Sequence, residues 1–115
     1  MTIPNSKELQ SLVDYTRSPY ATNPANVGPA INSMFNCTAI TNAGGKADYP
    51  FYWTSTSAIP NANGTFAYAW HVAFGLADNG SGEDLHGAGA VRFDGKTGVT
   101  EGGGLNYVRL VRNIQ

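Results

Sequence analysis

Residues that would bind a metal ion gather in one stretch of the sequence, Asp78-Asn79-Gly80-Ser81-Gly82-Glu83-Asp84. Carboxylate and amide oxygens on a loop are the ligands that calcium prefers, so Asp78, Asn79, Glu83 and Asp84 form a candidate calcium site. The stretch lacks the alternating D-x-D-x-D-G spacing of an EF-hand, and acidic loop tips are common for solubility alone. We therefore expect no cofactor, with calcium at these four residues as the alternative.

The side chains that would support catalysis are scattered along the chain. The hydroxyl run Thr54-Ser55-Thr56-Ser57 has no G-x-S-x-G turn, so we expect it to form hydrogen bonds within a sheet. His71 alternates with alanines and is expected to be packed or at the surface, and it has neither the spacing nor the cysteine partners of a zinc site. Cys37 is the single cysteine. It has no histidine or helix start nearby, which predicts a small buried side chain. We expect no enzymatic activity.

Ligand binding is the chemistry that the remaining candidates support. Exposed aromatic side chains stack on sugar faces or anchor protein contacts. Long irregular segments, such as the glycine-rich stretch after residue 75, are often functional. The candidate ligand-binding residues are Tyr20, Asn79, Asp84, His86, Arg92 and Tyr107. Among the late arginines (Arg92, Arg109 and Arg112), we expect at least one to be buried against an acidic residue.

The element expected to organise these residues is a β-hairpin over residues 51–74. Phe66, Tyr68, Trp70, Val72 and Phe74 recur with period two. This spacing places large side chains on one face of a strand and small ones on the other. Residues 51–57 form the partner run, and Asn63-Gly64 supplies the turn chemistry. We expect this hairpin to be the centre of a sheet.

The other predicted elements flank this hairpin. A capping box at Asn5 and Glu8 predicts a helix over residues 6–16. One or two helical turns are predicted over residues 30–35, burying Ile31, Met34 and Phe35, followed by an extended piece at 37–40 and a turn at 42–45. A small hairpin over residues 90–93 is predicted to turn at Asp94-Gly95. A closing strand is predicted over residues 105–114.

The composition indicates one domain spanning residues 1–115. Hydrophobic residues make up 42% of the chain, the net charge is −1 and only 13% of residues are charged. The basic patch that nucleic-acid binding requires is therefore not expected. No apolar run reaches the ~20 residues of a membrane span, so we expect no membrane insertion. No signal peptide is visible at the N-terminus.

Several motifs in order carry a resemblance to a known family: PNSKELQSLVDY, YWTSTS, AWHVAFG, DLHGAGAVR and NYVRLVR. From Ile3 to Arg112 the chain resembles the bacterial domain at the C-terminus of the Legionella collagen-like adhesin. Met1-Thr2-Ile3-Pro4 replaces the usual W-R-L-P lead-in, so a first strand is expected to be missing or supplied by upstream sequence. The stretch between Arg92 and Asn106 is also shorter than in close relatives.

The resemblance implies an α+β C-type-lectin-like fold, similar also to the formylglycine-generating enzyme. Its expected form is a twisted antiparallel sheet with one or two short helices and a long glycine-rich loop region. The E-P-N, Q-P-D and W-N-D motifs of calcium-dependent lectins are absent, and the paired cysteines of the formylglycine enzyme are absent too. The resemblance therefore implies a binding module rather than a catalyst.

Two functions follow as expectations. The first is an extracellular or cell-surface adhesion module that binds a glycan or protein ligand, with a homo-oligomer, a trimer, as its assembly. The second is a structural or receptor-binding display module of a phage tail or surface fibre that binds a protein partner. The near-neutral charge is evidence against sulfated glycans, since such ligands select basic clusters.

Overall fold

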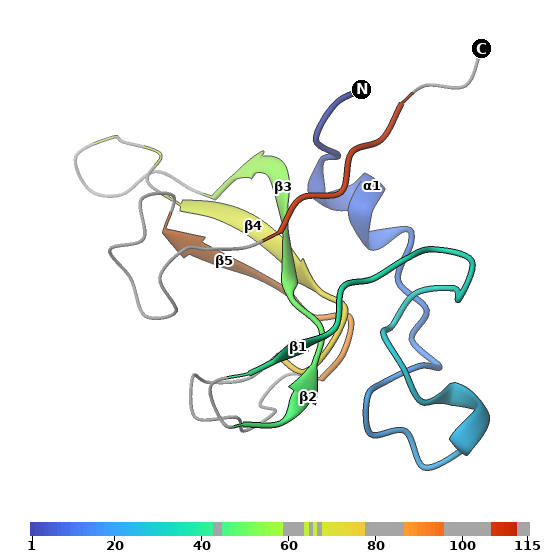
Figure 1. The fold of residues 1–115 in the computed structure, drawn as a ribbon. Helices are drawn as coiled ribbons and strands as arrows, with labels where there is room; N and C mark the ends of the chain where they lie inside the picture. The colour runs from blue at the N-terminus through green and yellow to red at the C-terminus, as the bar shows by residue number, and fades with distance from the viewer. Residues whose placement is uncertain are drawn as a thin grey trace.

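The computed structural model describes residues 1–42, 45–58, 64, 66, 68–77, 87–95 and 107–112. These residues form a small α+β fold with two antiparallel sheets and very little helix (Figure 1). The helices are α1 (Ser6–Gln10) and the 3₁₀ turn η1 (Pro24–Asn26), and the strands are β1 (Ile40–Thr41), β2 (Ala47–Asp48), β3 (Phe51–Ser57), β4 (Tyr68–Ala73) and β5 (Val91–Gly95).

The larger sheet has the strand order β3-β4-β5, with both neighbouring pairs antiparallel. The predicted pairing of the two runs is confirmed, since Tyr52 lies opposite Val72 and Trp53 opposite His71. The register shifts between Trp53 and Ser57, where β3 has extra residues relative to β4. The predicted turn chemistry at Asn63 lies outside the described residues.

The prediction of a small hairpin that turns at Asp94-Gly95 is wrong. Both residues continue the strand, with Asp94 opposite Ala69 and Gly95 opposite Tyr68. An Asp-Gly pair is a local turn signal. The edge of β4, however, offers partners to every residue of β5, and paired backbone groups are strongly favoured over unpaired ones. The non-local pairing therefore overrides the local signal.

The predicted capping box at the start of α1 is confirmed. The Asn5 side chain accepts a hydrogen bond from the Glu8 amide at 2.8 Å, and the Glu8 carboxylate accepts one from the Asn5 amide at 2.9 Å. These two bonds satisfy amides that the first helical turn leaves without partners.

The helix ends at Gln10, so the prediction that it continues to Thr16 is wrong. Val13 instead forms an antiparallel bridge with Ile31, and the Asp14 amide donates to the carbonyl oxygen of Ala30 at 2.8 Å. The Asp14 carboxylate accepts from the hydroxyl and the amide of Thr16, which lowers the pKa of Asp14. Such side-chain bonds give the backbone an alternative to the helix.

The prediction of helical turns over residues 30–35 is only partly correct. Ile31 is fully buried, but Met34 is 78% exposed and Phe35 lies at the surface. The Asn32 side chain accepts from the Met34 amide at 2.9 Å, and the Phe35 amide donates to the Asn32 carbonyl oxygen at 3.0 Å. One turn closed by an asparagine side chain therefore replaces the predicted helix.

The second sheet consists of β1 and β2, and it confirms the predicted reversal after residue 42. The Asn42 amide donates to the Lys46 carbonyl oxygen at 2.9 Å, and Gly45 has a φ of +77°. From there the chain leads through Asp48, whose side chain is buried, into β3.

The core lies between α1 and one face of the larger sheet. Its buried members are Leu9, Ile31, Tyr52, Val72 and Phe74. Partly buried residues pack against them: Leu12, Val13, Cys37 and Val91. The Ala30 amide donates to the Phe74 carbonyl oxygen at 2.7 Å and so fastens the loop after η1 to the end of β4.

The predicted closing strand over residues 105–114 is described at residues 107–112, where it is not a continuous strand. It pairs through two isolated bridges, Tyr107 with Tyr52 and Val111 with Thr2. Figure 1 shows this segment in red, beside the first residues of the chain and β3.

Candidate functional site

Three aromatic side chains form a cluster on strands β4 and β5, which we call the aromatic patch: Tyr68 and Trp70, both partly buried, and Phe93, which is exposed. Trp70 lies opposite Phe93 in the register. The ring of Phe93 stands edge-on to both partners, 5.2 Å from Trp70 and 5.8 Å from Tyr68 between centroids, with interplanar angles of 83° and 79°. Edge-to-face pairs of this kind hold aromatic rings in a defined orientation.

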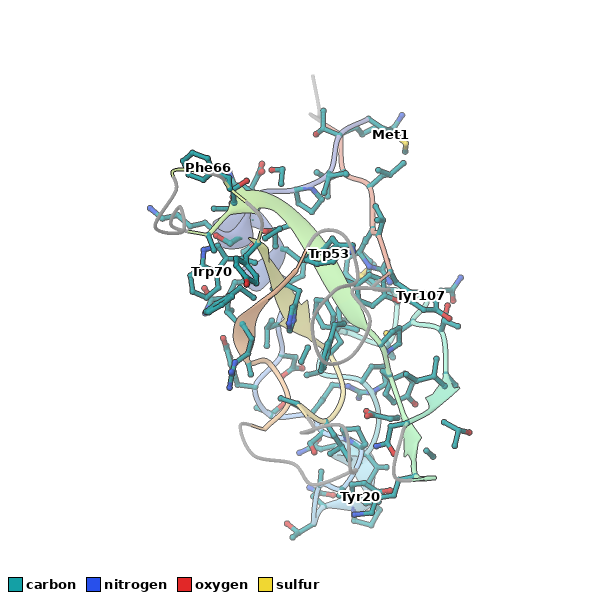
Figure 2. All side chains as sticks on the ribbon, turned by 90° about the vertical axis from the view of Figure 1, so that its left-hand side faces the viewer. Met1, Tyr20, Trp53, Phe66, Trp70 and Tyr107 are labelled. Carbon is teal, nitrogen blue, oxygen red and sulfur yellow. The ribbon has the colours of Figure 1, made fainter. Side chains whose placement is uncertain are left out.

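The aromatic patch lies on the same face of the sheet as the core. Alternation along β4 puts Tyr68, Trp70 and Val72 on one face, and Val72 belongs to the core. Phe93 remains 48% exposed, and Phe66, which precedes β4, is 55% exposed. Figure 2 places Phe66 and Trp70 toward the same end of the molecule. Large apolar surface that the fold leaves in contact with solvent is typical of a binding site.

The opposite face of β4 is the more deeply buried one. The imidazole of His71 stacks on the ring of Phe51 at 4.5 Å and 6°, and Trp53 meets it edge-on at 6.3 Å. His71 is 2% exposed, and its neighbours Ala69 and Ala73 are also buried. His71 is therefore a packed histidine, one of the two outcomes that the sequence predicted.

The predicted ligand-binding residues that the structure describes do not come together. Tyr20 lies in the loop before η1 and is 57% exposed, whereas Tyr107 lies beside β3. Figure 2 shows the two tyrosines well apart along the molecule. Arg92 is opposite His71 in the register, which puts it on the face away from the aromatic patch. The remaining candidates lie outside the described residues: Asn79, Asp84 and His86, together with Asp78 and Glu83 of the candidate calcium site.

Sequence reasoning missed the aromatic patch as a site, although the signal was present. The period-two alternation of Tyr68, Trp70 and Val72 identified the strand and its large face correctly. A strand at the centre of a sheet suggested an interior position, and the alternation carries no information on how far along the strand the core extends. That limit depends on where side chains from outside the sheet pack on this face, and Leu9 and Ile31 belong to the same cluster as Val72.

The predicted hydrogen bonding of the hydroxyl run within the sheet is confirmed for Thr54. The Thr54 hydroxyl donates to the Trp70 carbonyl oxygen at 2.9 Å, and the Thr56 hydroxyl accepts from the Ser6 amide at 2.9 Å. The first bond closes the irregular part of the β3–β4 pairing, and the second ties the start of α1 to the sheet. These hydroxyls therefore serve the fold.

A cluster of polar and aromatic side chains surrounds Cys37. Its sulfur lies 3.6 Å from the Tyr52 hydroxyl, and the guanidinium of Arg109 lies 5.5 Å from the centre of the Tyr52 ring and 5.9 Å from that of Phe35. Burial raises the pKa of the Cys37 thiol, against smaller opposing effects of the Tyr52 hydrogen bond and Arg109. A thiol with a raised pKa is a poor nucleophile at neutral pH, so this cluster does not have the chemistry of a reactive cysteine.

The structure refines the sequence predictions for Arg109 and Cys37. Arg109 is half-buried, but among the described residues its contacts are the two rings and the carbonyl oxygen of Asn36, to which it donates, rather than an acidic side chain. Cys37 is half-buried instead of fully buried.

Two further features can be judged for the described ranges: a metal site and a membrane-spanning helix. Within them, no group of three or more histidine, cysteine, aspartate or glutamate side chains is placed to hold a metal ion. The same residues contain no helix that is long and apolar enough to cross a membrane.

In comparisons with known proteins, no family model, no curated protein and no solved structure matches this chain. The resemblance to the adhesin domain family therefore rests on the sequence motifs and stays a prediction.

Proposed function

We propose that the protein is a non-catalytic ligand-binding module and that its ligand binds to the aromatic patch. The observation that carries this proposal is the edge-to-face arrangement of Tyr68, Trp70 and Phe93, with Phe93 about half exposed. Rings that are held in place by one another lose little conformational entropy when a ligand contacts them, so their contact surface converts efficiently into affinity.

A neutral glycan is the ligand class that this surface suits best. Aromatic rings present flat apolar faces to the C–H groups of a sugar, while the Tyr68 hydroxyl and the Trp70 indole N–H supply hydrogen-bonding groups at the ring edges. The chain has a net charge of −1, and Arg92 lies on the other face of the sheet. These features favour neutral sugars over sulfated ones.

For the fold, we propose a C-type-lectin-like domain of the adhesin family, displayed outside the cell or on its surface as part of a homo-oligomer. The support is the order of the sequence motifs, together with an early helix followed by a central antiparallel hairpin. The alternative is a display module of a fibre or phage tail that binds a protein. Phe66 and Phe93, both exposed, favour that alternative, since phenylalanine rings without polar groups suit an apolar protein surface.

A glycan array with neutral and sulfated sugars, read with calcium and with a chelator, tests the proposal. Selective binding to neutral sugars is expected, and Phe93→Ala should weaken the dissociation constant of the strongest hit by about tenfold or more. Tyr20→Ala is the matched control, because Tyr20 is a similarly exposed aromatic residue remote from the aromatic patch.

Three outcomes would count against the proposal that a glycan binds to the aromatic patch. Binding that survives Phe93→Ala but is lost in Tyr20→Ala would move the site to the Tyr20 loop. Loss of binding on chelation would instead support the calcium site at residues 78–84. A folded sample that binds no sugar on the array would favour the protein-binding alternative.

A further inference from the structure

The first and last described residues form a paired segment along the outer edge of β3, which we call the terminal strap: residues 1–4 and 107–112. The Thr2 amide donates to the Val111 carbonyl oxygen at 2.8 Å, and the Val111 amide donates to the Thr2 carbonyl oxygen at 2.9 Å. Figure 1 shows the blue first residues of the chain close to the red segment, residues 107–112.

The terminal strap occupies backbone groups of β3 that face away from β4. The Tyr107 amide donates to the Phe51 carbonyl oxygen, and the Trp53 amide donates to the Tyr107 carbonyl oxygen, both at 2.8 Å. The Ser55 amide donates to the Pro4 carbonyl oxygen, also at 2.8 Å. An open strand edge is a template for pairing with another extended chain, and here residues 1–4 and 107–112 of the same chain occupy it.

The C-terminal half of the strap is attached by few contacts. Its pairing consists of isolated bridges, and the side chains of Tyr107, Val108 and Leu110 are 42%, 48% and 51% exposed. Lifting this half from the edge therefore removes little apolar surface from the protein interior.

Two side chains anchor this half: the ring of Tyr107, which meets the Tyr52 ring at 6.0 Å between centroids, and Arg109, whose contacts are incomplete. Its guanidinium reaches the rings of Tyr52 and Phe35 and donates to the Asn36 carbonyl oxygen. Its Nε, however, is buried without a hydrogen-bond partner among the described residues. A buried polar group without a partner costs free energy, so part of the gain from the anchor is offset.

We propose that residues 107–112 are an exchangeable strand and that their alternative acceptor is a second copy of this chain. In the exchanged dimer, each copy places this segment on the β3 edge of the other copy and pairs Val111 with the other copy's Thr2. A second copy is the favoured partner because it offers the same backbone groups and the same Arg109 site, so no new complementarity is required.

The length of the connection before residue 107 limits how far residues 107–112 can reach toward a second copy. The connection between Gly95, the end of β5, and Tyr107 consists of residues 96–106. A connection of that length spans at most roughly 36–40 Å when it is fully extended. Because the exchanged dimer repeats the contacts of the monomer, protein concentration should decide which form is populated.

The test uses a disulfide to record which copy holds the strand. Thr2 and Val111 form a hydrogen-bonded antiparallel pair. The Cα atoms of such a pair lie about 5.5 Å apart, which suits a disulfide. The variant is therefore Thr2→Cys with Val111→Cys in a Cys37→Ala background. After mild oxidation at low concentration, the expected product is a closed monomer. After incubation at high concentration and the same oxidation, the expected product is a covalent dimer on a non-reducing gel.

The matched control is Thr2→Cys with Thr22→Cys in the same background, because Thr22 is exposed and lies in the loop before η1. It reports dimers that arise from random collisions. If this control forms as much dimer as the Thr2–Val111 variant, or if that variant forms closed monomers at every concentration, the proposal is overturned. The low-concentration monomer also shows that the engineered variant folds.

Exchange between unmodified copies gives an independent readout. Two differently tagged wild-type samples, mixed at high concentration, should form hybrid dimers, and Arg109→Ala should speed their formation several-fold. The final dimer fraction should not change, because the Arg109 contacts are equal in monomer and exchanged dimer. A wild-type sample that stays monomeric in sedimentation and forms no hybrids overturns the proposal without any engineered cysteine.

Discussion

The carboxylate of Asp48 accepts the amide proton of Leu76 at 2.7 Å, joining two distant parts of the sequence. The same oxygen accepts from the Tyr49 amide at 2.7 Å, and the other carboxylate oxygen accepts from the Asn42 side chain at 3.2 Å. Asp48 is 3% exposed. One buried side chain therefore connects the small β1–β2 sheet to the segment that leaves β4.

Asp48→Ala should lower the free energy of unfolding substantially. The hydrogen bond from the Leu76 amide is buried, and a buried donor that loses its acceptor costs about 1–3 kcal/mol. Asp48→Asn keeps an acceptor oxygen and should lose less. Urea unfolding followed by tryptophan fluorescence measures both variants, and equal midpoints for Asp48→Ala and wild type would show that these bonds contribute nothing.

Gly75 lies against this carboxylate and should not accept a side chain. A Cβ at Gly75 would collide with the Asp48 carboxylate oxygen and would lie 2.7 Å and 2.8 Å from backbone atoms of Tyr49. Gly75→Ala should therefore destabilise by about 1–3 kcal/mol, the range for overpacked interiors.

Gly45→Ala is the matched control for Gly75→Ala. No atom lies within 4 Å of a Cβ built there, but the φ of +77° is unfavourable for alanine. Its cost should be about 1 kcal/mol and purely conformational. Urea midpoints should rank wild type above Gly45→Ala and Gly45→Ala above Gly75→Ala, and the reverse order for the two variants would contradict the close packing at Gly75.

Local patterns predicted the parts of the fold that local physics decides. The Asn5–Glu8 capping box and the two strands of the central hairpin depend on residues close to one another in the sequence, and both are present. The end of α1 was missed because Val13 and Asp14 bind a loop far downstream, at Ala30 and Ile31. The helix propensity of residues 6–16 gives no information on that contact.

The candidate site was harder to predict for the same reason. Which rings remain exposed depends on where distant side chains pack on the sheet, as Leu9 and Ile31 do in the cluster with Val72. The place of β5 depends in the same way on its pairing with β4. The sequence correctly placed large side chains at Tyr68 and Trp70, but their exposure follows from tertiary packing. Tyr20 and Tyr107, chosen as loop aromatics, are exposed as expected but lie apart.

Asn5→Ala should remove the side-chain bond of the capping box at the start of α1 and loosen its reciprocal partner. The loss of an N-cap side chain costs about 1 kcal/mol, with a range of roughly 0.5–2 kcal/mol. Because α1 is short and carries Leu9 into the core, the loss should appear in global unfolding. Asn5→Ser keeps a capping oxygen and is the control. Thermal unfolding in which Asn5→Ala equals Asn5→Ser would contradict a contribution from the cap.

Stability should fall in alkaline solution because two neighbouring groups are held in their neutral forms. Burial raises the pKa of the Cys37 thiol above its ordinary 9.0 and that of the Tyr52 hydroxyl above its ordinary 10.0, and the Cys37–Tyr52 hydrogen bond further raises the latter. A group whose pKa is raised by folding contributes stability that is fully present below its ordinary pKa. That stability is lost as the pH rises through the raised value, so the decline should begin near pH 9.

Urea midpoints between pH 7 and pH 10.5 measure this decline, and the comparison of variants isolates it. The difference between each variant and wild type carries the information, because contributions that the variants share with wild type cancel in it. Cys37→Ala should remove the part of the decline that starts near pH 9, and Tyr52→Phe the part that starts near pH 10. The double variant should show the shallowest dependence, because neither buried group remains to be ionised. Identical slopes in the double variant and wild type would show that the Cys37–Tyr52 cluster does not govern alkaline stability.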